Sequence, residues 1–308
     1  MNESIRRTQD FYTQKPDAGI IQLEFGYYCL EAWKEQGYIN DSTDLQELFE
    51  YERIAVAGLG NLGWVTAALN PGFEWKVIKD LGDHELVQDD AGRHVLYFKN
   101  KRSGFMPEYV EHPVKDMRTW EENVKWRLDP ATASRYEGFD KHSKDVRVAQ
   151  EEGYHVQQGC IGGYMYLRSL IGPEDVLYKF YDEPELIHDC MKTWLELADS
   201  VAARHQKEVS IDELYFGEDI CYNHGSLISI DMIREFLFPY YRQLLDNVKK
   251  RQLDKARHLY FQVDTDGFSD QVIPVYRELG MDYLSPFEVA SNCDVVRTGR
   301  EYPCAEIC

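Results

Sequence analysis

The sequence predicts an α/β fold, a (β/α)8 TIM-type barrel of parallel strands, on three observations. An apolar run over 259–263 stops at an acidic turn, and a helical pattern over 271–279 then ends at Gly280. A second apolar run over 281–284 stops at another polar turn. This order of strand, acidic turn, helix and strand is typical of parallel β/α proteins. The length of 308 residues also fits one barrel of about 250 residues.

The other elements follow from apolar periodicity and from helix start and stop signals. Further strands are expected over 18–23, 53–57, 153–160 and 214–217. Helices are expected over 116–128, 131–151, 174–180, 183–208 and 230–251, and Pro239 should kink the last of them. These strands and the two described above make six, so an eight-stranded barrel would lack two.

Residues 75–115 carry a different pattern from the rest of the chain. Polar and apolar residues alternate on both sides of Asp89-Asp90-Ala91-Gly92, which is a turn sequence. This alternation predicts a β-hairpin inserted between barrel elements. We find no repeat or long linker, so we expect one domain over residues 1–308, with the hairpin as an insertion near 75–115.

Composition limits the classes of partner. The formal net charge of −20 argues against nucleic acid and anionic membranes, although plain solubility also explains it. There is no apolar run of membrane-spanning length, and the N-terminus lacks a signal-peptide core. Among seven cysteines the only close pair is Cys304 and Cys308, which favours a reducing cytoplasm over a disulfide framework. We therefore expect a cytoplasmic protein.

Carboxylates follow three of the predicted strands, where parallel folds bind their ligands. Glu218 and Asp219 follow one strand, Asp264 and Asp266 follow the next, and Glu288 follows the last. We expect them to face one cavity, with Glu218, Asp264 and Glu288 as candidate catalytic acids and Asp219 and Asp266 as candidate substrate ligands. Asp264, Asp266 and Glu288 could instead hold a divalent cation. Asp266 could also simply cap the following helix.

Other polar residues near these strand ends are candidate substrate ligands. Tyr222, Asn223 and His224 follow Asp219 on the same loop and could bind or orient a small polar substrate. A solvated surface position is the simpler interpretation of His224. Cys160 ends the strand predicted over 153–160 and could contact substrate or a metal, or merely line the cavity.

A glycine-rich segment, Gly58-Leu59-Gly60-Asn61-Leu62-Gly63, fits the G-x-G-x-x-G pattern of dinucleotide sites. Such a site needs a helix directly after the glycines, with its N-terminus at the pyrophosphate. Here Asn70-Pro71-Gly72 would break that helix early. A loop at the end of a barrel strand is the better interpretation.

Several motifs jointly resemble the uroporphyrinogen decarboxylase superfamily, which also holds the corrinoid- and coenzyme M-dependent methyltransferases. The resemblance covers roughly residues 50–300 and rests on these segments: Met106-Pro107-Glu108-Tyr109, Gly172-Pro173-Glu174-Asp175, Phe216-Gly217-Glu218-Asp219, Val263-Asp264-Thr265-Asp266-Gly267 and Pro286-Phe287-Glu288-Val289-Ala290. It implies the same barrel fold.

The resemblance also implies a function. Zinc-dependent methyltransferases of the superfamily carry His-x-Cys-Gly where this chain has Asp264-Thr265-Asp266-Gly267, so we expect oxygen ligands rather than thiolate-bound zinc. The Arg-rich substrate clamp of true uroporphyrinogen decarboxylases is missing from the N-terminal region. We therefore expect a methyltransferase that moves a methyl group from a small O-, N- or S-methyl donor to a separate corrinoid protein.

Two alternatives stay open at this stage. One is a decarboxylase acting on a tetrapyrrole or a small acid, which arginines facing the cavity would favour. The other is an inactive, truncated barrel, because the family continues for a few dozen residues beyond the position of Cys308. A barrel incomplete at its C-terminus would leave a strand edge unpaired, so a second copy of the chain is also an expected partner.

Overall fold

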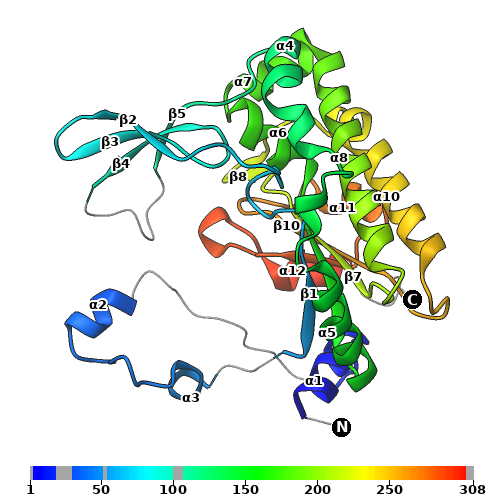
Figure 1. Ribbon diagram of the computed structural model, residues 1–308. Helices are drawn as coiled ribbons and strands as arrows, with labels where there is room; N and C mark the ends of the chain where they lie inside the picture. Colours follow the sequence, from blue (N-terminus) through cyan, green and yellow to red (C-terminus); the bar gives the residue numbers. More distant parts are fainter. Residues whose placement is uncertain (1–2, 19–29, 51–53, 100–106, 303–308) are drawn as a thin grey trace.

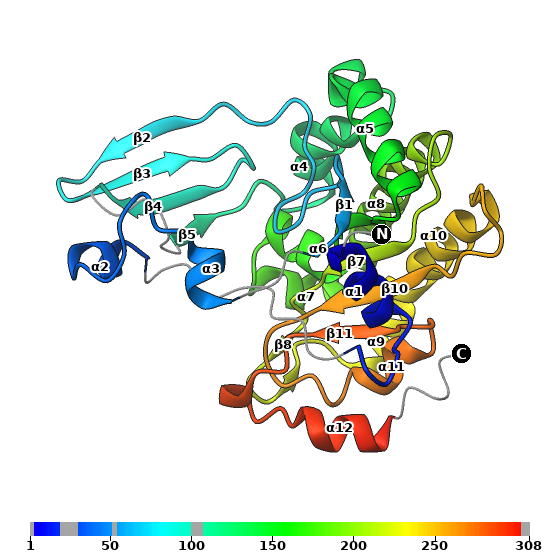
Figure 2. The ribbon, with the colours of Figure 1, turned by 90° about the horizontal axis from the view of Figure 1, so that it is seen from below.

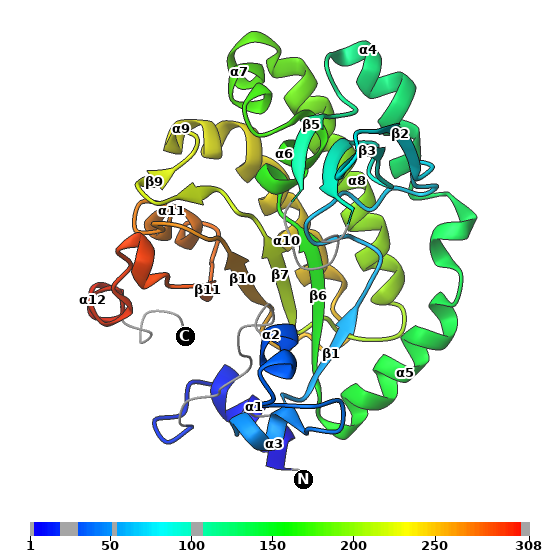
Figure 3. The ribbon, with the colours of Figure 1, turned by 90° about the vertical axis from the view of Figure 1, so that its left-hand side faces the viewer.

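A parallel five-stranded sheet forms the centre of the computed structural model, which describes residues 3–18, 30–50, 54–99 and 107–302. Its strands are β1 (Val56–Leu59), β6 (His155–Ile161), β7 (Glu213–Gly217), β10 (Tyr260–Asp264) and β11 (Tyr283–Ser285). They lie in the order β1-β6-β7-β10-β11, and each neighbouring pair is parallel (Figure 3). The fold is thus mixed α/β, and the closed eight-stranded barrel and the single domain stay predictions.

Helices connect the parallel strands, as the periodicity predicts. Their bounds are α5 (Phe139–Glu152), α6 (Gly163–Ile171), α7 (Asp175–Asp182), α8 (Pro184–His205), α9 (Ile230–Met232), α10 (Phe238–Arg251), α11 (Ile273–Arg277) and, after β11, α12 (Val295–Glu301). In Figure 1, β1 and β7 run down the middle of the molecule, with α8 and α10 to their right. The core lies between these helices and the sheet.

Two of the helices predicted before β6 are divided. The segment over 116–128 consists of α4 (Met117–Thr119), a π-helical turn (Trp120–Val124) and a 3₁₀ turn (Lys125–Leu128). A 3₁₀ turn over Ala133–Tyr136 precedes α5, and Gly138, with φ 74°, separates the two. Glycine adopts this left-handed conformation without a steric penalty, so the chain can turn there.

The helix predicted over 230–251 is interrupted just before Pro239, and the predicted kink itself stays a prediction. A π-helical turn, Ile233–Leu237, lies between α9 and α10, and Pro239 falls in the first turn of α10. Proline has no N–H to donate, and the first turn of a helix needs none there. The expected single helix over 230–251 is therefore two α-helical segments joined by a wide turn.

The hairpin predicted over 75–115 is part of a four-stranded antiparallel sheet. Its strands are β2 (Lys76–Asp80), β3 (His84–Gln88), β4 (His94–Phe98) and β5 (Glu108–Glu111). Asp89 Oδ1 accepts hydrogen bonds from the N–H groups of Ala91 and Arg93, which closes the β3–β4 turn. This sheet extends away from the parallel sheet (Figures 1 and 2).

The N-terminal region holds α1 (Glu3–Tyr12), α2 (Leu30–Glu35) and α3 (Leu45–Phe49). The strand predicted over 18–23 falls almost wholly outside the described residues, as do Cys304 and Cys308. Within the described ranges, the cysteines Cys160, Cys190, Cys221 and Cys293 are free thiols. No helix in that part of the chain combines the length and the apolar character needed to cross a bilayer.

The two faces of the parallel sheet differ in chemistry because successive strand residues point to opposite sides. Leu214, Phe216, Phe261 and Val263 point to the face covered by helices and are buried in the main hydrophobic cluster. Each such side chain contributes roughly 1.5–3 kcal/mol of stability through burial. The alternate positions form the open face and carry polar and aromatic groups, among them Tyr215 and Asp264, which are only half-buried.

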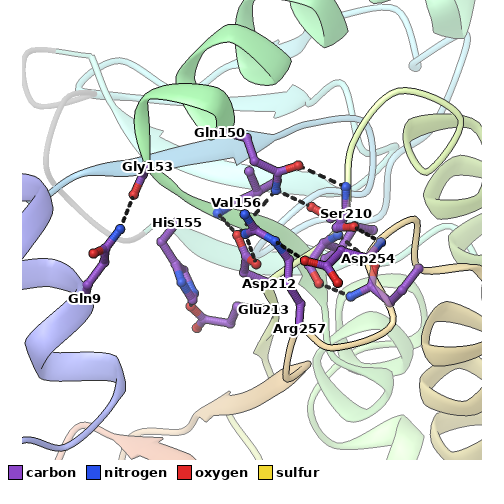
Figure 4. A network of polar contacts seen from close by, with 12 residues as sticks. Gln9, Gln150, Gly153, His155, Val156, Ser210, Asp212, Glu213, Asp254 and Arg257 are labelled. Atoms are coloured by element: carbon purple, nitrogen blue, oxygen red, sulfur yellow. Dashed lines mark hydrogen bonds and ion pairs between the residues drawn. The ribbon is translucent and has the colours of Figure 1, made fainter.

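A polar network ties the elements together at the N-terminal ends of the strands (Figure 4). Asp212 accepts hydrogen bonds from Val156 N (2.8 Å) and from Arg257 Nη1 (2.7 Å). Gln150 of α5 donates to the carbonyl of Ser210 (2.7 Å), just before β7. Contacts at this end of parallel strands usually serve stability, and the opposite end is the functional one.

Candidate functional site

Asp264 is the centre of a polar group at the carboxyl ends of the parallel strands. Its Oδ2 accepts hydrogen bonds from Tyr215 OH (2.9 Å) on β7 and from Ser285 Oγ (3.2 Å) on β11. Gln262 Nε2 in turn donates to Ser285 Oγ (3.0 Å). Three adjacent strands therefore fix the position of this carboxylate on the open face.

Trp64 packs on this group and was not predicted from the sequence. Its ring stacks on that of Tyr215, with centroids 4.6 Å apart and planes 1° from parallel. Gly217 allows this approach, because a Cβ at that position would lie 2.9 Å from the backbone oxygen of Trp64. The glycine-rich segment 58–63, which starts in β1 and continues into the loop after it, thus brings Trp64 to the strand ends. No helix follows these glycines before residue 76, so the dinucleotide pattern lacks the helix it needs.

Asp266 and Glu288 lie next to Asp264, in the turns that follow β10 and β11. Glu288 Oε2 accepts hydrogen bonds from Gly267 N (2.6 Å) and Ser291 Oγ (3.1 Å), so Glu288 holds the turn that carries Asp266. Asp266 itself is exposed. Partial burial, followed by the charges of Asp219, Glu288 and Asp264, raises the pKa of the Asp266 carboxyl. The alternative that Asp266 caps the next helix does not hold, because no side chain caps α11.

Arg168 supplies the cation that faces these carboxylates, and sequence reasoning missed it. It projects from α6, the helix after β6, and its Nη1 forms an ion pair with Asp219 Oδ2. Asp219 follows β7 with φ 45°, a left-handed conformation that an aspartate tolerates better than most residues. The charge of Arg168 is also the one that acts to lower the pKa of Asp266.

Glu218 does not lie with the other carboxylates on the open face. It is fully buried, and its carboxylate accepts hydrogen bonds from Tyr241 OH (2.7 and 2.9 Å) and from Tyr164 N (3.2 Å). Burial is the main cause that raises the pKa of Glu218 to about 7. Because Tyr164 N belongs to the first turn of α6, this carboxylate caps the helix from a distant part of the chain.

The expectation of one shared cavity is thus wrong for Glu218, and the pleat of β7 gives the reason. Residues 214, 216 and 218 point to the helix-covered face, whereas Tyr215 and Asp219 point to the open face. The close approach also requires Gly162, since a Cβ there would lie 1.8 Å from Glu218 Oε2. The geometry gives Glu218 a structural contact, and its catalytic role stays a prediction.

The remaining predicted ligands are divided between the two sides of the sheet. Tyr222, Asn223 and His224 are exposed on the turn between β8 (Cys221–Tyr222) and β9 (Gly225–Ser226). Phe268 N donates to the carbonyl of Tyr222 (2.8 Å), which places this turn beside the one that carries Asp266. Cys160 is buried on the helix-covered face, and burial raises the pKa of its thiol. Cys160 is therefore a core residue in this geometry.

The predicted metal role of Asp264, Asp266 and Glu288 finds no support in their arrangement. Across the described ranges, no group of three or more His, Cys, Asp or Glu side chains is placed so that it could hold a metal ion. Asp264 and Glu288 each use an oxygen to accept two hydrogen bonds. A divalent cation at this position stays a prediction, and the chemistry below does not depend on one.

Comparisons with known proteins add little to this geometry. No protein-family model and no curated protein sequence matches the chain. Among solved structures it is similar to a methyltransferase from Methanosarcina mazei, with 14% sequence identity and a TM-score of 0.42. The match covers 59% of this chain and 49% of that protein, so the chain spans about half of its length. At this TM-score the similarity assigns neither fold nor function, and the resemblance to the uroporphyrinogen decarboxylase superfamily rests on the sequence motifs.

Proposed function

We propose that the chain is a methyltransferase, which moves a methyl group from a small O-, N- or S-methyl donor to a corrinoid carried by a partner protein. The observation that carries the proposal is the grouping of Asp266 with the fixed carboxylate of Asp264 at the strand ends on the open face, and the raised pKa of Asp266 agrees with it. A carboxyl with a raised pKa next to an oriented anion suits proton transfer to a poor leaving group. The motifs that resemble corrinoid-dependent methyltransferases supply the choice of reaction.

The proposed chemistry assigns a proton transfer to this chain. When the bond between the methyl carbon and the heteroatom breaks, the heteroatom keeps the electron pair and takes a proton from Asp266. The partner protein's reduced corrinoid would supply the electron pair that forms the new bond to the methyl carbon. Asp264, held by Tyr215 and Ser285, would orient the donor through a hydrogen bond, and Trp64 would give it an apolar contact. The exposed turn with Tyr222 and His224 would contact the donor's outer end.

Decarboxylation of a tetrapyrrole is the weaker proposal. Such a substrate carries several carboxylates and needs several cations to bind it. Arg168 is paired with Asp219, and the groups beside it are Asp264, Asp266 and Glu288. These charges would repel a polyanionic substrate. We therefore expect the purified chain to release no carbon dioxide from uroporphyrinogen.

The test is donor-dependent consumption of free cob(I)alamin, followed by its visible absorbance under anaerobic conditions. Methylated alcohols, phenols, amines and thiols would be offered as separate donor classes. We expect one class to be demethylated, and we expect Asp266→Asn to lower that rate by about 100-fold or more, the usual contribution of a general acid. Asp264→Asn should mainly raise KM, because it removes an orienting contact.

A matched control separates catalysis from general charge effects. Asp246 is exposed on α10, so Asp246→Asn makes the same chemical change on the far side of the helix layer. Its rate should stay within twofold of the wild-type rate. Cob(I)alamin left unchanged by every donor class, or an Asp266→Asn variant as fast as wild type, would refute the proposal.

A further inference from the structure

A second pocket lies between α5 and α8, on the helix side of the sheet. It has a volume of about 320 Å³ and is open to solvent. In Figure 3 both helices lie to the right of β6. The strands β10 and β11, which carry Asp264 and Ser285, lie to the left of β6. The rings of Phe139 on α5 and His205 on α8 are 4.3 Å apart and fix the two helices to each other.

Positive charge gathers around this pocket in a chain that is otherwise strongly acidic. Lys144, Arg204 and Lys207 line it, and none of them forms an ion pair within the described residues. The wider chain has 54 acidic and 34 basic side chains, so an unpaired cluster of cations is unexpected. Arg204 rests on the ring of Tyr136 instead, at 3.9 Å.

Two carboxylates also line the pocket, but they do not neutralise it. Glu208 forms an ion pair with Arg147 of α5 (3.4 Å), so its charge is already compensated. Asp140 lies in the first turn of α5. The cations still outnumber the carboxylates, so the local charge favours an anion over a cation.

Two kinds of hydrogen-bond donor belong to the helix that forms one wall of this pocket. α5 has 14 residues, and no side chain caps its first turn after Gly138, so the N–H groups of that turn are available to a ligand. The Ser143 side chain, in the pocket wall, is buried, and its hydroxyl has no hydrogen-bond partner. A buried hydroxyl without a partner is destabilising, and rotation about χ1 would let it donate to a bound group.

We propose that this pocket binds a small phosphate-type anion, held by Lys144, Arg204 and Lys207 and by the Ser143 hydroxyl. Several cations together with neutral donors match a tetrahedral dianion with several acceptor oxygens better than a single carboxylate. This site is separate from the strand-end group around Asp264. It stands whether or not the chain transfers methyl groups.

The test is isothermal titration of inorganic phosphate into the full chain at constant ionic strength, with acetate as a second probe. We expect saturable binding of phosphate and at least tenfold weaker binding of acetate. Lys144→Ala and Lys207→Ala remove exposed side chains and should each weaken phosphate binding about tenfold or more, the worth of one charge-assisted hydrogen bond. Lys249→Ala, an equal change of charge on α10, should stay within twofold of wild type.

Ser143→Ala distinguishes a ligand contact from a structural one. Because the hydroxyl has no partner in the protein, its removal should leave the unfolding temperature equal or higher while phosphate binding weakens severalfold. The proposal is overturned if phosphate does not saturate, if acetate binds equally well, or if Lys249→Ala weakens binding as much as Lys207→Ala. It is also overturned if Ser143→Ala leaves phosphate binding unchanged.

Discussion

Glu218 and Asp266 are carboxylates of neighbouring strand ends, and burial raises the pKa of both, yet their surroundings differ completely. Glu218 is enclosed by Tyr241, Tyr276 and the first turn of α6. Asp266 is exposed, and the charges of Asp219, Glu288 and Asp264 add to the rise of its pKa. Hydrogen-bond donors surround the first group, and like charges surround the second. A raised pKa alone therefore does not identify a catalytic acid.

The comparison predicts that Glu218 serves stability and that Asp266 serves chemistry. The difference arises from the sheet, because β7 directs position 218 to the helix-covered face and β10 directs positions 264 and 266 to the open face. Substitutions at the two carboxylates should therefore separate unfolding from activity. The predictions below are ordered by their expected effect on the free energy of unfolding, from the largest, at Glu218, to the smallest, at Asp266.

The largest effect is expected for Glu218→Ala. It leaves the hydroxyl of Tyr241 and an amide of α6 without their acceptor, in a fully buried position. We expect the free energy of unfolding to fall by about 4 kcal/mol in urea denaturation. Glu196→Ala, an exposed change on α8, should cost less than about 0.5 kcal/mol. A loss below about 1 kcal/mol at Glu218 would contradict the structural role.

The second effect is a pH dependence carried by Glu218. Its pKa is about 7 in the folded protein and 4.5 in the unfolded chain, so the folded state binds the proton more tightly. Protonated Glu218 therefore contributes about 3 kcal/mol to the free energy of unfolding. This contribution is complete below about pH 4.5 and is lost as pH rises through about 7. The free energy of unfolding should be measured from pH 4.5 to 8. It should fall with rising pH by this amount in the wild type and stay nearly constant in Glu218→Gln. Parallel curves would contradict the prediction.

A smaller effect is expected for Tyr215→Phe. The change removes the hydrogen bond to Asp264 but keeps the ring that stacks on Trp64. We expect a loss of about 1 kcal/mol in the free energy of unfolding. Because Asp264 loses one of its positioning contacts, the kcat/KM for the methyl donor should fall about tenfold. Tyr178→Phe, at an exposed tyrosine of α7, should change neither quantity.

The smallest effect on stability is expected for Asp266→Asn. The side chain is exposed, and the change removes a charge that Asp219, Glu288 and Asp264 repel. The free energy of unfolding at pH 7 should stay equal or rise by a few tenths of a kcal/mol. Urea denaturation checks this, with Asp246→Asn as the reference. A loss above about 1 kcal/mol would show that Asp266, like Glu218, supports the fold.

Sequence patterns predicted much of the architecture because they report local constraints. Apolar runs followed by polar turns gave the parallel strands over 214–217, 259–263 and 281–284 to within about two residues. The long helix α8 and the turn over 89–92 also agree with their predicted ranges. The four-stranded extent of the antiparallel sheet was missed, because β2 and β5 pair through registers that alternation does not specify.

The candidate site, like the fold, has one part that the sequence predicted and one part that it did not. By itself the sequence determined that carboxylates follow the strands at one edge of a parallel sheet, since chain order and strand polarity require it. Only the tertiary structure decided that Glu218 accepts a hydrogen bond from the first turn of α6. The same holds for the ion pair of Arg168 with Asp219 and for the stacking of Trp64 on Tyr215. These contacts join residues 51 to 151 positions apart in the chain. They depend on the pleat of each strand and on loop paths, which composition and periodicity do not encode.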